Sequence, residues 1–307
     1  MSESRSVVRA TERRNPRSAD IDLLDPEALV ELFNAEDALI PAAVSAARRE
    51  IADAIARIER TFRAGGRLFY VGAGTSGRLG VLDASECPPT FGTAPDLVQG
   101  IIAGGRDALV RSVEGAEDDP AAGAAAIVER GAGERDVVTG IAASGTTPFV
   151  AGALQAARAR GAAVILVTCA EPPTDIAELV DVLIQLDVGP EIVTGSTRLK
   201  AGTATKLVLN MLTTGALIRI GKTYGNLMVD LQATNAKLRQ RGTRMVADVA
   251  GVSEDVARDA LDGASGRVRT AIVMAFEGTD ATAAEARLAA VDRRLRAIVG
   301  PPPPLVP

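Results

Sequence analysis

The sequence predicts an α/β protein with a doubly wound, five-stranded parallel sheet in an α-β-α sandwich. N-terminal helices and a small C-terminal three-helix module are expected to flank it. Between residues 68 and 186, five short apolar segments alternate with helical ones. Glycine- and hydroxyl-rich turns follow two of those segments. The chain of 307 residues is 47% hydrophobic and 3% aromatic, enough for one large domain with an aliphatic core.

Residues 1–20 are expected to form an irregular arm, because Asn15-Pro16 blocks regular structure. We expect the arginines of this arm to be solvated: Arg5, Arg9, Arg13, Arg14 and Arg17. Helical spacing of apolar residues then predicts helices over Glu27–Asn34 and Ile40–Ala64.

The alternating region is predicted from apolar runs bounded by glycine. The expected strands are Leu68–Val71, Leu97–Ala103, Val137–Ala142, Val164–Thr168 and Val182–Leu186. The expected helices begin near Ser76, span Asp107–Glu114 and Ala121–Arg130, and run from the turn at 144–148 through Arg160. In such sheets ligands bind at the carboxyl ends of the strands.

The C-terminal third is expected to be helical. The long apolar helix predicted over Arg198–Lys222 either covers the sheet or contacts a second subunit. Further helices are expected over Gln232–Ala250, Ser253–Leu261, Arg267–Phe276 and Thr282–Val299, before the Pro301–Pro304 tail. Four parts of the chain are predicted: an N-terminal arm with helices (1–50), the α/β domain (51–240), a small helical module (241–300) and a proline-rich tail (301–307).

Composition restricts the chemistry and the setting. The net charge of −5 does not indicate a nucleic-acid-binding surface. Neither a secretory signal nor an apolar run of membrane-spanning length is recognised in the sequence. Cys87 and Cys169 are too few for a disulfide framework, which predicts a cytoplasmic protein. The chain has no histidine, so acid–base catalysis must use Glu, Asp, Lys or Tyr, and metal sites built on imidazole are excluded.

The segment Gly72-Ala73-Gly74-Thr75-Ser76-Gly77 joins the first strand to a helix and predicts a phosphate site. Glycines allow the backbone to approach a ligand, and the helix N-terminus offers unpaired N–H groups. The same letters satisfy the dinucleotide fingerprint G-x-G-x-x-G. That fingerprint expects a carboxylate at the end of the second strand, where Gly104-Gly105 stands instead. A purely structural turn remains the other alternative.

Two further clusters carry hydroxyl groups. The turn Ser144-Gly145-Thr146-Thr147 can hold phosphate oxygens or sugar hydroxyls, or its Ser and Thr can simply cap a helix. The second cluster consists of Glu191, Ser196, Thr197 and Lys200. Lys200 either neutralises a phosphate or lies on the surface.

Carboxylates are the candidate acids and bases. Glu86 precedes Pro88-Pro89, which are expected to end the helix, and a carboxylate at a helix end is unfavourable enough to suggest function. Glu114 and Glu117 have the i, i+3 spacing of one helical face, although a solvated acidic turn is the alternative. One carboxylate could remove a proton while a separated one delivers a proton.

Most of the chain resembles the N-acetylmuramic acid 6-phosphate etherase family, within the sugar-isomerase (SIS) superfamily. The most specific matching blocks are G-T-S-G-R-L-G-V-L-D-A-S-E-C-P-P-T-F-G, V-E-G-A-E-D, T-G-S-T-R-L-K-A-G-T-A-T-K-L-V-L-N-M-L and G-N-L-M-V-D. The resemblance implies an SIS-type sandwich, a homodimer and a ubiquitin-associated-type helical module at the C-terminus. It also implies a sugar-phosphate substrate and no cofactor or metal.

The resemblance also implies roles for individual residues. The glutamate of A-S-E-C-P-P, Glu86, corresponds to the proton donor, and the later glutamate of V-E-G-A-E-D, Glu117, to the second catalytic residue. The SIS pattern implies phosphate contacts at Thr75, Ser76, Ser144 and Thr147. The full set of predicted substrate-binding residues is Gly74, Thr75, Ser76, Gly77, Ser144, Gly145, Thr146, Thr147, Glu191, Ser196 and Lys200. Family members often carry arginine where this chain has Thr146.

The implied reaction cleaves the D-lactyl ether of N-acetylmuramic acid 6-phosphate by elimination and hydration, giving N-acetylglucosamine 6-phosphate and D-lactate. Two alternatives stay open on the same fold. An aldose–ketose sugar-phosphate isomerase would remove a C2 proton without cleaving an ether. A sugar-phosphate-binding regulator, related to glucokinase-regulator-like chains, would need neither glutamate.

Overall fold

The computed structural model describes residues 9–231 and 236–303. The chain forms two compact units. The first consists of Met1–Ser85 and Pro95–Ala216, and the second of Glu86–Ala94 and Leu217–Pro307. The expected helix start at Gln232 lies outside the described residues, and the predicted domain boundaries stay predictions.

The first unit is built on a five-stranded sheet in which every neighbouring pair is parallel. The strands are β1 (Leu68–Gly72), β2 (Val98–Ile102), β3 (Val137–Ile141), β4 (Ala163–Thr168) and β5 (Val182–Gln185). Their order across the sheet is β2-β1-β3-β4-β5. This order confirms the predicted doubly wound architecture, with each strand within two residues of its predicted bounds.

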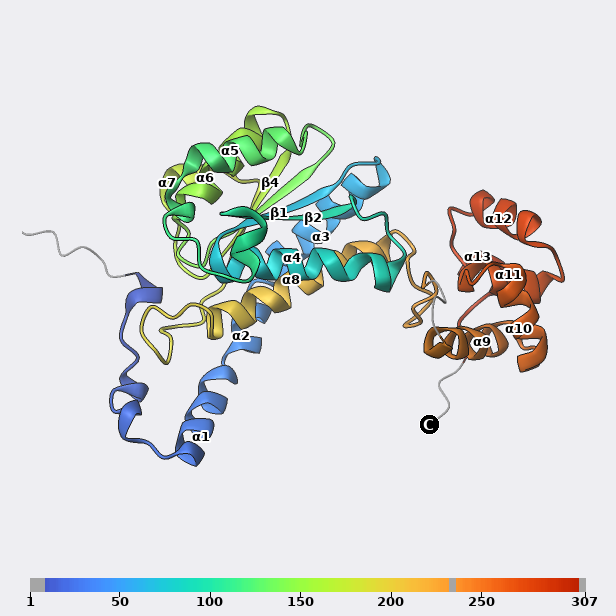
Figure 1. Ribbon diagram of the computed structural model, residues 1–307, viewed down its shortest axis with the longest axis horizontal. Coiled ribbons are helices and arrows are strands. Elements are labelled where there is room, and N and C mark those ends of the chain that lie inside the picture. The colour runs from blue at the N-terminus through green and yellow to red at the C-terminus, as the bar shows by residue number, and fades with distance from the viewer. Residues whose placement is uncertain (1–8, 232–235, 304–307) are drawn as a thin grey trace, which may run out of the picture. The chain divides into compact units, whose positions relative to one another are not determined.

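Helices cover both faces of the sheet, as Figure 1 shows. On one face, Phe69 and Val138 pack against helices α5 (Pro120–Glu129), α6 (Pro148–Ala159) and α7 (Thr174–Leu179). The other face is covered by helices α3 (Arg48–Arg63), α4 (Gly74–Phe91) and α8 (Lys200–Arg219). Tyr70 points to this second face, where its hydroxyl donates to the Leu209 carbonyl of α8. The alternation of side chains along each strand therefore fills two separate cores.

Several predicted helices differ from the observed ones. The segment expected to be helical over Ile40–Ala64 is divided at Ala47 into α2 (Ile40–Ala46) and α3, and α7 was not predicted. The expected short helix over Asp107–Glu114 is a 3₁₀ helix, Gly105–Leu109, followed by irregular backbone.

The N-terminal arm is tied to the first unit through Glu36 of α1 (Pro26–Asp37). Asn15 Nδ2 donates to Glu36 Oε2 over 2.8 Å, and the Arg17 guanidinium lies 3.0 Å from Glu36 Oε1. Ser18 Oγ also donates to the Ile192 carbonyl. Burial alone would raise the pKa of Glu36, but Lys200, Asn15 and Arg17 together lower it. Arg17 is exposed, as expected, and it also pairs with the buried Glu36.

The second unit has its own apolar core. Its helices are α9 (Ala236–Ala250), α10 (Glu254–Gly263), α11 (Val268–Glu277), α12 (Ala281–Ala290) and α13 (Arg296–Val299). Buried Val246, Leu261 and Ile272 belong to this core. The helix predicted over Thr282–Val299 is interrupted because Asp292 and Arg293 have positive φ angles of 54° and 58°.

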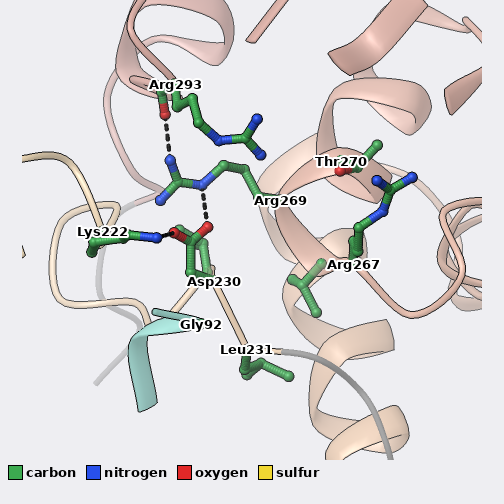
Figure 2. Close-up of a pocket in the computed structure, with 10 residues that line it drawn as sticks. Gly92, Lys222, Asp230, Leu231, Arg267, Arg269, Thr270 and Arg293 are labelled. Atoms are coloured by element: carbon green, nitrogen blue, oxygen red, sulfur yellow. Dashed lines mark hydrogen bonds and ion pairs between the residues drawn. The ribbon is translucent and has the colours of Figure 1, made fainter. Parts of the chain in front are cut away.

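A charged cluster in the second unit surrounds Asp230, as Figure 2 shows. Lys222 Nζ lies 3.0 Å from Asp230 Oδ2, and Arg269 Nε lies 2.6 Å from Asp230 Oδ1. Arg269 also donates to the carbonyls of Arg293 and Gly221. Burial lowers the pKa of Arg269, and the nearby Asp230 carboxylate opposes that shift. The guanidinium thus links three segments of the second unit.

Among the helices of residues 9–231 and 236–303, none is long and apolar enough to cross a membrane.

The amino ends of β1 and β3 are joined by Asp136, which gives a prediction for stability. Its carboxylate accepts hydrogen bonds from the Arg67 side chain, the Arg67 N–H and the Gly133 N–H. Burial would raise the pKa of Asp136, but these hydrogen bonds hold it below its ordinary value. We expect Asp136→Asn to lower the free energy of unfolding at pH 7 by about 1–3 kcal/mol.

The pH dependence provides the check. Because the folded-state pKa of Asp136 is lowered, its contribution is present above the unfolded-state pKa of about 3.9 and is lost as pH falls further. In urea denaturation, the difference between wild type and Asp136→Asn should shrink as the pH is lowered below about 4. Asp53→Asn, at an exposed pair with Arg57, is the control and should change stability by less than about 0.5 kcal/mol. A pH-independent difference would contradict the assignment.

Candidate active site

The candidate site lies where the strand order reverses. β1 and β3 are neighbours, and the chain leaves their carboxyl ends toward opposite faces, into α4 and α6 respectively. A doubly wound sheet has an open crevice at such a point. Both predicted hydroxyl-rich turns, Gly74–Gly77 and Ser144–Thr147, directly follow these two strands. The fold therefore brings them to the same edge of the sheet.

The first turn depends on close backbone approach. A Cβ on Gly72 would lie 2.7 Å from Gly77 N, and one on Gly77 would lie 2.7 Å from Gly72 O. Gly74 has a φ angle of +52° and is the first residue of α4, two residues before the predicted start. Thr75 and Ser76 are half-buried in the first turn of this helix. The N–H groups of a long helix are thus aimed at the crevice.

The second turn is stabilised from within. Thr146 donates to Ser144 Oγ through both its N–H and its Oγ1, over 3.3 Å and 3.1 Å. Gly145 has a φ angle of +72°, and a Cβ there would lie 3.0 Å from Pro172 Cα. Thr147 is the residue before α6, and its side chain does not cap that helix. The helix-capping alternative is therefore wrong for Thr147.

A cavity of about 160 Å³ lies beside the first turn. Its lining includes Gly74 at the start of α4 and both Glu114 and Glu117. The two glutamates do not share a helical face, because Gly115 between them has a φ angle of +73° and only Glu117 belongs to the 3₁₀ helix Ala116–Asp118. Both side chains are exposed, and Ser112 Oγ donates to Glu114 Oε1. Glu117 can therefore reach a ligand held at the start of α4.

Glu86 lies within α4 and not after it. The helix continues through Pro88 and Pro89 to Phe91, so the prediction that these prolines end it is wrong. Proline lacks an N–H donor, but the Gly92 N–H still reaches the Pro88 carbonyl over 2.9 Å, and Phe91 is buried. The side chain of Glu86 is exposed. Because more than a full turn of helix follows it, the unfavourable position at a helix end is relieved.

The third cluster is largely internal. The Glu191 carboxylate accepts the N–H groups of Lys200 and Ala201, so it caps α8, and burial raises its pKa. Lys200 Nζ lies 2.5 Å from Glu36 Oε2, and the Lys200 side chain is 1% exposed. The surface alternative for Lys200 is wrong. Ser196 is half-buried in the loop before α8, and substrate contacts from this cluster stay predictions.

Sequence reasoning missed Arg9. Arg9 NH1 donates to Thr146 Oγ1 over 2.7 Å, so the arm reaches the second turn. A contact across 137 residues leaves no local signal in the sequence, and the arm was expected to be solvated.

Several known proteins are similar to this chain. Residues 50–158 match the family model described as glucokinase regulatory protein N-terminal SIS domain. N-acetylmuramic acid 6-phosphate etherase of Gloeobacter violaceus is 56% identical over 280 residues, covering 90% of this chain and 91% of its own. The etherase of Mesorhizobium japonicum is 53% identical over 292 residues, covering 95% of both chains. The solved phosphoheptose isomerase of Neisseria gonorrhoeae aligns with 61% of this chain and 98% of its own, with a TM-score of 0.46 and 20% identity.

A doubly wound sheet with glycine and hydroxyl turns at its switch point, together with the family-model match, defines an SIS-type α/β protein. Within that class the identity and coverage of the relatives are decisive. The chain belongs to the N-acetylmuramic acid 6-phosphate etherase family.

The contact between Gly72 and Gly77 gives a prediction for the turn. In Gly77→Ala the new methyl group would meet Ile102 Cγ1 at 2.6 Å and Gly72 O at 2.7 Å, so the start of α4 must move. We expect a loss of about 1–3 kcal/mol in the free energy of unfolding, measured by urea denaturation. Binding of glucosamine 6-phosphate, measured by calorimetry, should weaken as well.

Gly65→Ala is the matched control, because Gly65 has a φ angle of +74° but no atom within 4 Å of the added Cβ. Gly65→Ala should lower the free energy of unfolding by about 1 kcal/mol through backbone strain alone, and it should leave sugar-phosphate binding unchanged. An equal loss of glucosamine 6-phosphate affinity in the two variants would show that the turn is not involved in binding the sugar phosphate.

Proposed function

We propose that this chain cleaves the D-lactyl ether of N-acetylmuramic acid 6-phosphate, giving N-acetylglucosamine 6-phosphate and D-lactate. The activity makes it a carbon–oxygen lyase of cell-wall amino-sugar recycling. Within the site, one observation carries the proposal: Glu117 and the first residue of α4 line the same cavity. A base and an anion-binding helix terminus in one cavity suit proton removal from an anchored sugar phosphate.

The phosphate is bound by the two turns. Thr75 and Ser76 donate from the first turn of α4, together with its unpaired N–H groups. Ser144 and Thr147 donate from the second turn, which precedes α6. Hydroxyl and N–H donors on two helix termini suit a compact monoester dianion.

The two glutamates divide the acid–base work. Ring opening exposes the C1 aldehyde and makes the C2 hydrogen acidic, and Glu117 as the base removes that hydrogen as a proton. The electron pair forms the C2–C3 double bond and expels the lactyl oxygen from C3. Glu86 donates a proton to this departing oxygen. Water then adds at C3 of the unsaturated aldehyde. Glu86 takes one proton from this water as its oxygen bonds to C3, and Glu117 gives a proton to C2, so both glutamates regain their starting protonation. Carboxylates suffice for every proton transfer.

A second candidate is a sugar-phosphate-binding regulator without catalysis. The match of residues 50–158 to a regulatory-protein domain favours it specifically. The third alternative, an aldose–ketose isomerase, would exchange the C2 proton without releasing lactate. Release of lactate from the phosphorylated muramic sugar separates the etherase from both.

The catalytic assignment predicts that Glu117→Gln and Glu86→Gln each lower lactate release at least about 100-fold, because each removes one proton-transfer group. Lactate is measured with a coupled dehydrogenase assay. Glu114→Gln is the matched control, since Glu114 lines the same cavity but has no assigned role. It should retain activity within about threefold.

Circular dichroism should confirm that all three variants fold. In isotopic water, the wild-type product should carry label at C2 and in the C3 hydroxyl group. Near-normal turnover in Glu117→Gln or Glu86→Gln would remove that residue from its role, and label at C2 without lactate would favour an isomerase.

We further propose that the protein works as a cytoplasmic homodimer. Leu82 of α4 and Met211 of α8 are 50% and 43% exposed, and these adjacent helices are linked by the Asn210–Asp83 hydrogen bond. Exposed large apolar side chains on neighbouring helices favour a subunit contact. Two free, buried cysteines and a phosphorylated sugar substrate suit the cytoplasm.

The dimer proposal predicts that Met211→Glu dissociates the protein, because a buried unpaired charge opposes association. Light scattering should give the mass of a dimer for wild type and of a monomer for the variant. Val128→Glu, at a similarly exposed position on α5, is the control and should remain dimeric. A wild-type monomer at working concentration would refute the proposal.

A further inference from the structure

We infer that Arg9 is a phosphate-binding residue of this site: its guanidinium, held at Thr146, faces the dianion of the substrate. This inference rests on the proposed function in one respect, namely that a phosphorylated sugar binds at the two turns. It assigns a role to the N-terminal arm, which contributes none of the residues considered above for binding.

The contact itself is specific. Arg9 NH1 donates to Thr146 Oγ1 over 2.7 Å, and the Thr146 hydroxyl donates in turn to Ser144 Oγ over 3.1 Å. A guanidinium has five N–H donors in a planar fork, so this contact uses one and leaves the others for an anion. Because Ser144 is a proposed phosphate ligand, the guanidinium lies one hydroxyl group away from the proposed phosphate position.

Charge balance supports the same assignment. A phosphate monoester carries a charge of about −1.5 to −2 at neutral pH, whereas Lys200, the cation predicted from the sequence, is neutralised by Glu36. Arg78, beside the cavity with Glu117, donates to the carbonyls of Leu109 and Arg111. Arg9 contacts the second turn directly.

A separate cavity adjoins Arg9, and none of the described residues that line it belongs to the two turns. Its volume is about 520 Å³, and it is lined by Arg9 and Arg13 of the arm, by residues 169–174 after β4, by Gln185 at the end of β5 and by Asp187. Glu171 and Asp187 add negative charge to this lining. A phosphate would therefore be held on the Thr146 side of the guanidinium, away from these carboxylates.

The arm is held well enough to fix this position. Asn15, Arg17 and Ser18 are anchored to Glu36 and to the loop before α8. Glu12 Oε2 also lies 3.5 Å from the position of a Cβ on Gly195. Only five residues lie between Arg9 and the Asn15 anchor, so a short, tethered segment positions the guanidinium at the turn. A fork-shaped donor at a fixed position favours phosphorylated over unphosphorylated sugars.

The test compares Arg9→Ala and Arg9→Lys with wild type. Calorimetric titration with glucosamine 6-phosphate should give a dissociation constant about tenfold higher for Arg9→Ala, with an intermediate value for Arg9→Lys. With N-acetylmuramic acid 6-phosphate, KM should rise by a similar factor while kcat stays within about threefold. Inorganic phosphate should become a correspondingly weaker competitive inhibitor.

Arg14→Ala, on the same arm and exposed, is the matched control and should behave as wild type. The unfolding temperature of Arg9→Ala should also match wild type, since the side chain is exposed. Unchanged sugar-phosphate affinity in Arg9→Ala, or a loss confined to kcat, would overturn the inference. If wild type binds glucosamine 6-phosphate but releases no lactate, the proposed reaction fails, while the binding comparison still decides the role of Arg9.

Discussion

The close approach between the end of β1 and the start of α4 is the constraint on which the site depends. Neither Gly72 nor Gly77 has room for a Cβ, because each would meet backbone atoms of the other within 3 Å. The contact turns the chain sharply from a buried strand into a helix and aims the first N–H groups of that helix at the switch point. This turn positions the residues between Gly72 and Gly77, including the half-buried Thr75 and Ser76.

Buried charge fixes the other side of the first unit. Glu36 gathers Lys200, Arg17 and Asn15, while Glu191 caps α8. A buried ion pair adds little stability over apolar packing, but removing one partner is costly because the other is left unpaired. The pair therefore serves chiefly to specify where α8 and the arm lie. Lys200 and Glu191 were predicted from the sequence to bind substrate. In the structure, both residues position the surrounding backbone.

The sequence predicted the sheet well because parallel strands buried on both faces are continuous apolar runs between glycines. The two hydroxyl-rich turns could also be predicted, because their Gly, Ser and Thr residues are adjacent in the sequence and directly follow strands. Helix ends were harder to predict. Pro88 does not end α4, because the buried Phe91 anchors the next turn. Glu114 and Glu117 do not share a helical face, because Gly115 between them has a positive φ angle. Partners such as Glu36 and Lys200, 164 residues apart, have no local pattern.

The arm illustrates why charge in a sequence says little about its use. Arginine next to arginine is typical of a solvated segment, and several of these side chains are exposed. Once Asn15 and Arg17 are anchored, however, the residues before them can reach only a limited area. That area includes the turn before α6, where the dipole of the helix already favours an anion. The inferred role of Arg9 adds a cation to the proposed anion site at this turn. On that inference the arm would act with the sheet edge in binding rather than as a separate basic tail.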